Sequence, residues 1–263
     1  MSSNIPDFTA RLLIDAGIDK GMRVLDVGCG SGDVSLLLLK LVGVEGGVVG
    51  IDHDSRAIAI ARQRSEAMNN PSLTFLECDL LKLPNSFGTF DAIVGRRVLM
   101  YQKDAVATIR TIATYLRPGG IVVFQEHDTT MAPASLDPFP LHKRAQGWLQ
   151  QMIAREGADL NIGFNLHSIF TKAGLVVENV RAECLVQTPD TPYSLGNIVR
   201  ACLPRIIDLG VASAEEVEIE TLQKRLDEER SGSQSIYIGD VMFGSWARKT
   251  CLLQDTDTAT SRQ

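Results

Sequence analysis

The chain has 263 residues, of which 44% are apolar and 22% charged, and this ordinary globular composition excludes wholesale disorder. A chain of this length buries roughly seven tenths of the surface of its unfolded form, so it needs neither a disulfide nor a metal to fold. The 26 basic residues stand against 32 acidic ones, which gives a net charge of −6. Such a balance lacks the basic field that holds a phosphate backbone, so we expect no nucleic-acid partner.

Cysteine usage and the missing targeting signals predict a cytoplasmic protein. The five cysteines are odd in number and have no paired spacing, which is typical of reduced thiols. Residues 1–17 lack a basic flank before an apolar core, so we do not expect a signal peptide. The longest apolar stretch, residues 36–44, is short and contains Lys40, and we therefore expect no membrane partner.

The first half of the chain alternates short β-like runs with helical patterns. In the third predicted helix, apolar residues recur at positions 105, 109, 112 and 116, as one helical face requires. Strand–helix alternation of this kind predicts an α/β fold with a doubly wound parallel sheet. The predicted strands are 22–28, 48–52, 73–79, 90–95 and 121–126, and the predicted helices are 35–43, 55–68 and 103–116.

The second half is less regular. Ser213 and Glu216 form a capping box at the head of a charged helix that is predicted to run to about Arg230. Residues 188–212 are interrupted by Pro and Gly and receive no assignment. The other predicted elements are helices at 141–152 and 165–173 and strands at 175–186 and 235–249.

We interpret the chain as a single domain over residues 1–250. Residues 20–126 form its core, and residues 133–163 and 188–230 are insertions that cover a substrate. Residues 251–263, rich in Thr, Ser and Asp, are expected to be a flexible tail.

A glycine-rich loop follows the first predicted strand. Gly28, Gly30 and Gly32 lie where a strand turns into a helix, so a ligand can approach the backbone without meeting a Cβ. The helix N-terminus behind the loop offers free amide donors. Dinucleotide-binding enzymes space their glycines as G-x-G-x-x-G, whereas here the third glycine comes one residue early and Asp33 follows it. A carboxylate beside a pyrophosphate is unfavourable, which argues against a nicotinamide cofactor.

Two aspartates close the next two predicted strands. Asp52 is placed to accept hydrogen bonds from both hydroxyls of a ribose. Asp79 is placed to accept one from an adenine amino group. Alternative roles are the N-cap of the following helix for Asp52 and a turn cap for Asp79. Asp26, before the glycine loop, is interpreted as an organiser of that loop.

In these segments the sequence resembles the class I S-adenosylmethionine-dependent methyltransferases, in their broad small-molecule group. The resemblance covers residues 20–126 and rests on five segments in the family's order, VLDVGCGSGDVS, GIDHD, FLECDL, FDAIVGRRVLMY and LRPGGIVVF. It implies a Rossmann-like sheet of seven strands with an antiparallel last strand.

The resemblance also implies the cofactor, S-adenosylmethionine, and the residues that bind it. Gly28, Gly30 and Gly32 would surround its methionine part, and Gly95 would contact that part through its backbone. Asp52 and the adjacent His53 would lie at the ribose, and Asp79 and Leu80 at the adenine.

Methyl transfer from a sulfonium needs alignment and exclusion of water, and it needs a base only when the acceptor must lose a proton. His127, after the fifth predicted strand, is the candidate base because an ordinary histidine has its pKa near working pH. The alternative is a loop histidine without a role.

Several residues are candidates for binding the substrate. Arg96, Arg97 and Tyr101 follow the fourth strand, where the arginines would repel a divalent cation and could hold a substrate anion. We therefore expect no catalytic metal. Trp148 lies on a helix that would cover the site. Surface ion pairs, for the arginines, and core packing, for Trp148, are the alternatives.

The sequence thus predicts methyl transfer to a small molecule, with a hydroxyl as the candidate acceptor. Rival hypotheses are a methyltransferase fold that keeps the cofactor but catalyses a cyclisation or isomerisation, an RNA or protein methyltransferase, a nicotinamide oxidoreductase, and a non-enzymatic binding protein. A homodimer through the charged helix is possible.

Overall fold

A seven-stranded sheet organises the computed structural model, which describes residues 7–68, 70–131, 134–191 and 193–250. The strand order is β3-β2-β1-β4-β5-β7-β6. Strands β1 to β5 run parallel, and β7 lies antiparallel between β5 and β6, which confirms the predicted fold class. The strands are β1 (Arg23–Val27), β2 (Gly47–Asp52), β3 (Leu73–Glu77), β4 (Phe90–Arg96), β5 (Leu116–Asp128), β6 (Val176–Gln187) and β7 (Tyr237–Arg248).

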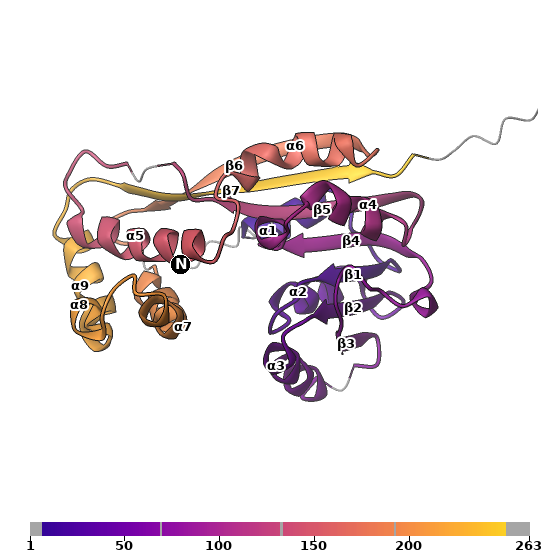
Figure 1. Cartoon of the computed structure of the whole chain (residues 1–263), viewed down its shortest axis with the longest axis horizontal. Coiled ribbons are helices and arrows are strands. Elements are labelled where there is room, and N and C mark those ends of the chain that lie inside the picture. The colour runs from indigo at the N-terminus through magenta and orange to yellow at the C-terminus, as the bar shows by residue number, and fades with distance from the viewer. Residues whose placement is uncertain (1–6, 69, 132–133, 192, 251–263) are drawn as a thin grey trace, which may run out of the picture.

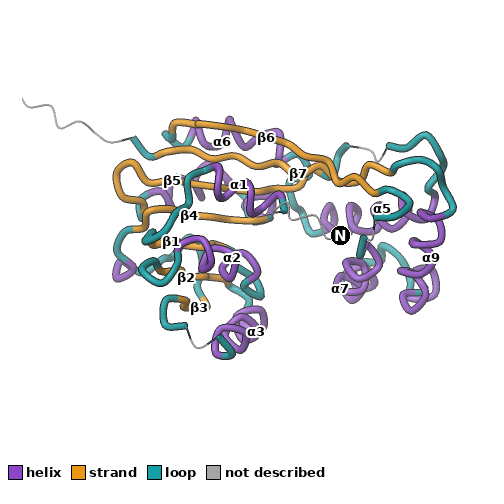
Figure 2. Tube along the Cα trace, turned by 180° about the vertical axis from the view of Figure 1, so that it is seen from behind, coloured by secondary structure: helices purple, strands orange, loops and turns teal. Residues whose placement is uncertain are grey.

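Helices cover both faces of the sheet, so the central strands are apolar on both sides. Helices α1 (Phe8–Asp15), α2 (Asp33–Val42) and α3 (Ser55–Glu66) pack on one face. Helices α4 (Ala105–Ala113) and α6 (Ile162–Lys172) pack on the other (Figures 1 and 2). Strand β1 has β2 on one side and β4 on the other, so the chain changes winding direction there. Ligands bind beyond the carboxyl ends of the strands at such a point.

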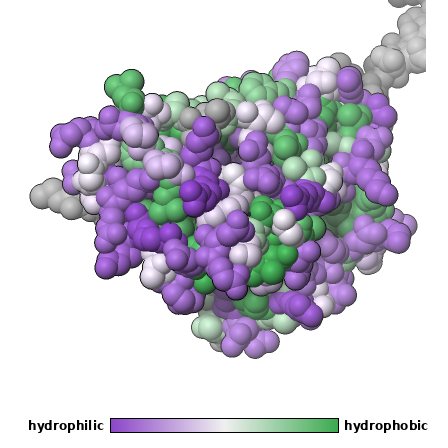
Figure 3. Space-filling view, turned by 60° about the vertical axis from the view of Figure 1, so that its left-hand side comes forward, coloured by the Kyte–Doolittle hydropathy of each residue, from purple (hydrophilic) through white to green (hydrophobic). Residues whose placement is uncertain are grey.

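The remaining helices form a separate cluster, which we call the helical cluster. It comprises α5 (Pro140–Arg155), α7 (Leu195–Asp208), α8 (Ala214–Val217) and α9 (Ile219–Ser231), and it has an apolar core of its own. It lies beneath the ends of the long strands β6 and β7, across from strands β1, β2 and β3 (Figure 1). Hydrophilic side chains dominate its outer face, with separate apolar areas between them (Figure 3).

Two elements differ from the sequence-based expectations in the helical cluster. Residues 195–208 form a helix, α7, although Pro204 lies inside it. Its burial against α5 and α9 supplies the stability that its composition does not indicate. The predicted capping box of Ser213 and Glu216 is present, but it caps the short helix α8. Glu218 then adopts a left-handed conformation with φ of 48°, and α9 starts anew after it.

Strand β5 is longer than predicted at both ends. It includes residues 117–120, which were expected to separate a helix from a strand, and it continues to Asp128. The antiparallel pairing with β7 over Ile121–Asp128 explains the extension at the carboxyl end. Glu126, His127 and Asp128 therefore belong to the strand and do not follow it. Pro133 and residues 251–263, the expected tail, lie outside the described residues.

None of the helices in the described parts of the chain combines the length and apolar character needed to cross a membrane.

Packing against Gly95 in β4 leaves no room for a side chain at this position, and a prediction follows from it. A Cβ at this position would overlap the Phe124 ring and approach its Cδ1 to 2.8 Å, whereas a Cβ at Gly47 in β2 would meet Ser72 O at an ordinary 3.8 Å. We expect Gly95→Ala to destabilise the protein by about 1–3 kcal/mol through overpacking. Gly47→Ala should leave stability within about 1 kcal/mol of wild type.

Urea unfolding of both variants measures this difference. A further Phe124→Leu substitution should recover part of the loss in Gly95→Ala. Equal stabilities of the two single variants would contradict the packing argument.

Candidate active site

A cavity of about 510 Å³ lies at the carboxyl ends of the first strands. It is of a size typical for small-molecule sites. It brings together seven of the residues predicted from the sequence, from the ends of β1, β2 and β3 and from the loop after β4. The residues that line it are Gly28, Ile51, Asp52, His53, Cys78, Asp79, Leu80, Arg97, Val98, Tyr101 and Gln102.

The glycine loop has the conformation that its composition suggests. Gly28 and Gly30 have φ of 63° and 53°, in the left-handed region that favours glycine. A Cβ at Gly28 would lie 2.6 Å from Val98 Cγ2, so the loop packs closely against the segment after β4. A Cβ at Gly30 would meet nothing within 4 Å, so this part of the backbone borders open space. Gly32 packs against the Phe75 ring at the start of α2, behind the cavity.

Asp52 joins the glycine loop to the end of β2. Its Oδ2 accepts a hydrogen bond from Gly30 N at 2.8 Å, and its Oδ1 accepts one from Asp54 N at 2.9 Å. The N-cap of α3 is Asp54, whose side chain accepts from Arg56 N, so Asp52 does not have the alternative role. The Asp52 side chain is 12% exposed at the cavity, and its oxygens keep lone pairs for further donors. Exposed His53 lies beside it.

Asp79 lines the cavity and also has the alternative role of a turn cap. It lines the cavity two residues after β3, and its Oδ1 also accepts from Leu81 N at 2.9 Å and so caps a turn. The side chain is half exposed, with Lys82 Nζ 3.5 Å from Oδ2. Leu80 and Cys78 add apolar surface beside it, and burial raises the pKa of the Cys78 thiol.

Glu126 in β5, which the sequence did not identify, holds the loop after β4. Its Oε1 accepts hydrogen bonds from Val98 N at 3.0 Å and Leu99 N at 2.8 Å. The side chain is fully buried, which raises its pKa to about 7, and its Oε2 has no partner among the described residues. An acidic residue inside an apolar strand was the available signal for this role.

A second buried carboxylate anchors the other wall. Asp26 Oδ2 accepts a 2.5 Å hydrogen bond from Ser35 Oγ of α2, and burial raises the Asp26 pKa to about 7. Asp26 is 1% exposed and therefore organises the loop instead of contacting a ligand.

Arg97 enters the cavity from a strained backbone. Its φ is 57°, which is unusual for a residue with a Cβ, and its N–H donates to Gln125 O at 2.8 Å. Arg96 instead turns toward α2, where its Nη2 lies 3.8 Å from Asp33 Oδ2.

Six of the predicted site residues are absent from the cavity lining, and two of them, Gly30 and Gly32, belong to the glycine loop described above. His127 is partly buried within β5, and burial, together with the charges of Arg97 and Arg96, lowers its pKa to about 3. It is therefore neutral at physiological pH and weakly basic in the free protein. Gly95 and Arg96 occupy the positions described above. Trp148 is buried in the core of the helical cluster, in agreement with the packing alternative.

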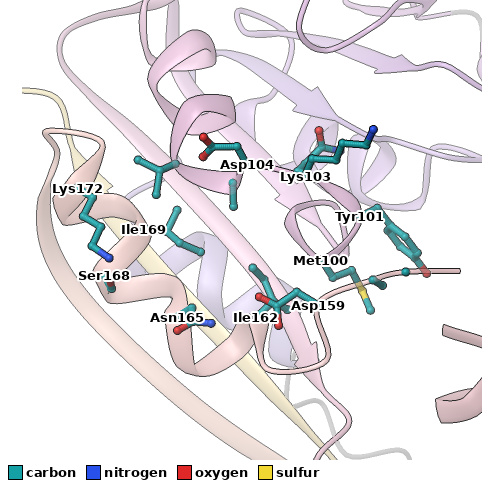
Figure 4. Close-up of a pocket in the computed structure, with 15 residues that line it drawn as sticks. Met100, Tyr101, Lys103, Asp104, Asp159, Ile162, Asn165, Ser168, Ile169 and Lys172 are labelled. Atoms are coloured by element: carbon teal, nitrogen blue, oxygen red, sulfur yellow. The ribbon is translucent and has the colours of Figure 1, made fainter. Parts of the chain in front are cut away.

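A second cavity, of about 570 Å³, lies on the outer side of the loop after β4 (Figure 4). It is bounded by the 3₁₀ turn Leu99–Tyr101 and by helices α4 and α6. Tyr101 and Gln102 belong to both cavities, and the Tyr101 ring points away from Asn165 and Lys172 on α6. This cavity contains none of the predicted cofactor residues.

The described residues contain no group of three or more His, Cys, Asp or Glu side chains that could hold a metal ion.

Comparisons with known proteins agree with this geometry. A family model described as a methyltransferase domain matches residues 18–174, which include the whole lining of the first cavity. A demethylmenaquinone methyltransferase of Staphylococcus aureus strain MRSA252 is 31% identical over 132 residues, which cover 50% of this chain and 54% of the relative. The one from strain JH9 is 28% identical over 188 residues, covering 65% and 75%. The chain thus spans about half the length of the first relative.

Solved structures share the fold. A phosphoethanolamine N-methyltransferase 2 of Haemonchus contortus, in complex with S-adenosylhomocysteine, aligns with a TM-score of 0.58 at 17% identity over 92% of this chain and 52% of that one. The [4+2]-cyclase SpnF aligns with a TM-score of 0.54 at 21% identity over 92% of this chain and 80% of that one.

The position of Asp52 generates a prediction. We expect Asp52→Ala to weaken binding of S-adenosylhomocysteine by at least about tenfold, because the variant loses the ribose hydrogen bonds and the tie to Gly30, and each such bond contributes roughly 1 kcal/mol or more. Titration calorimetry measures the dissociation constant.

Asp54→Ala is the matched control. It removes the N-cap of α3 and should cost about 1 kcal/mol of stability while leaving the affinity unchanged, since the Asp54 N–H that supports Asp52 remains. Equal affinities of wild type and Asp52→Ala would show that Asp52 does not bind the cofactor.

Proposed function

This chain belongs to the class I S-adenosylmethionine-dependent methyltransferases, and we propose that it methylates a hydroxyl group of a small molecule without a catalytic metal. The observation that carries the proposal is the first cavity, where the glycine loop, Asp52 and Asp79 meet beside Arg97 and Tyr101. In this proposal the donor and acceptor sites would be adjacent.

The residues of the cavity fit S-adenosylmethionine. Open space at Gly30 admits the methionine part, the free lone pairs of Asp52 suit two ribose hydroxyls, and Asp79 with Leu80 suits an adenine. With this cofactor the glycine loop would not have to bind a phosphate. The carboxylate of Asp33 at the head of α2, which would disfavour a phosphate, is therefore acceptable there. When bound, this cofactor supplies a methyl group on a sulfonium whose departure needs no acid catalyst.

The chain's own groups would position the acceptor and manage its proton. Arg97 would hold an acceptor oxygen and lower the pKa of its hydroxyl by charge attraction. The proton would pass to His127, whose low pKa comes first from burial and then from the two arginine charges, of which a negative acceptor oxygen would offset the second contribution. The helical cluster would exclude water from the reacting atoms.

The relatives suggest the first acceptors to test. Their names specify demethylmenaquinone, so this compound is the first acceptor to test, beside a panel of hydroxylated aromatic compounds that the proposed hydroxyl acceptor calls for.

Thermal unfolding with S-adenosylhomocysteine, and with NADH for comparison, tests the cofactor. At a hundred times its dissociation constant, a ligand of the native state adds about 2.7 kcal/mol and raises the melting temperature by several degrees. We expect this rise with S-adenosylhomocysteine and none with NADH, and the reverse result would contradict the proposal.

Product mass tests the reaction. Incubation with S-adenosylmethionine and a hydroxylated aromatic panel should yield a product heavier by one methylene. Conversion without a mass gain would favour a cyclisation or isomerisation.

The role of His127 gives a further prediction. We expect His127→Ala to lower kcat roughly a hundredfold through loss of the proton acceptor, with no change in cofactor affinity. Because the pKa of His127 in the free protein is about 3, the wild-type kcat/KM should show no fall between pH 9 and pH 6 from this residue. Unchanged turnover in the variant across this range would place the base elsewhere.

A further inference from the structure

The second cavity, of about 570 Å³, has no part in the proposed function, although it is large enough for a small molecule. Hydrogen bonds hold the elements that bound it. Asp159 N donates to Met100 O at 2.8 Å, which ties the connection between α5 and α6 to the 3₁₀ turn after β4. Arg110 Nη2 donates to Lys172 O at 2.5 Å, which ties α4 to the end of α6. The cavity is therefore formed before any ligand enters it.

The floor of this cavity is apolar. Its buried members belong to the apolar core between the sheet, α4 and α6, and its half-buried members pack on that core and expose apolar surface. Close packing beneath the floor gives it a fixed shape. Contact with such a surface favours a ligand with an apolar body. The residues of the floor are Met100, Ala105, Val106, Ala158, Ile162 and Ile169.

A polar face of α6 forms the rim above this floor. Asn165, Ser168 and Lys172 line the cavity at spacings of three and four residues, so they lie on one side of the helix. The Lys172 ammonium ends beside Ser168 (Figure 4). Within the part of the chain that the structure describes, these three side chains have no hydrogen-bond or ion-pair partner, whereas the neighbouring Thr171 hydroxyl donates to His167 O at 2.9 Å. One ammonium, one hydroxyl and one amide are therefore available to a ligand.

Two aspartates also border the cavity, but both are engaged with backbone donors. Asp104 Oδ1 accepts from Ala107 N at 2.8 Å, as the N-cap of α4. Asp159 Oδ1 accepts from Asn161 N at 2.8 Å. The unused groups thus lie on the α6 rim, and they are donors. A carboxylate matches them, because its two oxygens accept several hydrogen bonds at once.

We propose that the second cavity binds a small amphipathic carboxylate, with its apolar body on the floor and its carboxylate at Lys172, Ser168 and Asn165. This ligand is distinct from the cofactor and the acceptor, because the polar rim of α6 belongs to the second cavity alone. Tyr101 and Gln102 form the wall between the two cavities, so the ligand would lie beside the cofactor cavity without entering it. The inference does not rest on the proposed function.

The physical basis of selectivity is the replacement of water around a carboxylate. The ammonium of Lys172 offers it a charge-assisted hydrogen bond, which is roughly twice as strong as a neutral one. A neutral amide of the same shape gains only neutral hydrogen bonds at the rim. Because Lys172 is exposed, solvent screens its charge, and we expect the difference in affinity to be at least about fivefold but not much larger.

The test compares three probes of similar shape on the full chain without cofactor. The probes are phenylacetate, phenylacetamide and phenethylamine, and amide chemical shifts of the isotope-labelled protein give the dissociation constants and the place of binding. We expect phenylacetate to bind with a dissociation constant on the order of a few millimolar or below, and at least about fivefold more tightly than either other probe. The shifts should centre on α6 and the 3₁₀ turn.

Substitutions of Lys172 test the role of its charge. Lys172→Met keeps an apolar stem but removes the charge, so it should reduce the preference for phenylacetate over phenylacetamide to about twofold or less, and Lys172→Arg should keep it. Lys40→Met is the matched control. Lys40 is likewise an exposed lysine in the last turn of a helix, α2, but it lines neither cavity, so this variant should bind all three probes as wild type does.

Several results would overturn the inference. They are the absence of a preference for phenylacetate in wild type, tighter binding of phenethylamine, and an unchanged preference in Lys172→Met. Shifts centred on Asp52 and Arg97 would also overturn it, because they would place the ligand in the first cavity. Failure of the proposed function has a different readout, since S-adenosylhomocysteine binding and product mass are measured without these probes.

Discussion

The hydrogen bonds between the buried Glu126 carboxylate and the loop after β4 are the constraint on which the site depends. The loop leaves the sheet at Arg97 in a left-handed conformation, which an unsupported chain would not retain. Glu126 offsets that strain by accepting from two consecutive backbone N–H groups. Val98 is thereby pressed against Gly28, and the loop and the glycine turn become the two walls of one cavity. Asp26 holds the glycine turn in a similar way, because its carboxylate accepts a hydrogen bond from Ser35 Oγ.

Charge is distributed unequally across the site. The carboxylates Asp52 and Asp79 line one side of the first cavity, and in the proposed function they would face a ligand that is rich in hydrogen-bond donors. The opposite side carries Arg97, whose charge, after burial and together with that of Arg96, lowers the pKa of His127. In the proposed function this side would favour ligands that bring negative or strongly polar oxygens.

The molecule divides into a shared half and an individual half. The family match ends at residue 174, and it covers the cavity lining and the strands that position it. Strands β6 and β7 and helices α7, α8 and α9 follow this limit. Similarity therefore identifies the cofactor chemistry, and in the proposed function the choice of acceptor would depend on the part of the chain beyond the family match.

The sequence by itself determined the doubly wound sheet and the residues at its carboxyl edge. The apolar runs end in glycine or aspartate for a local reason. Each strand stops at the edge of the sheet where ligands bind, and the chain turns there. Gly28, Asp52 and Asp79 could be placed for that reason. The tertiary structure alone decided the role of Glu126, the extension of β5 through His127, and the burial of Trp148. These depend on partners far along the chain, such as Val98 for Glu126 and strand β7 for the extension of β5, and no local pattern records which distant group a side chain will meet.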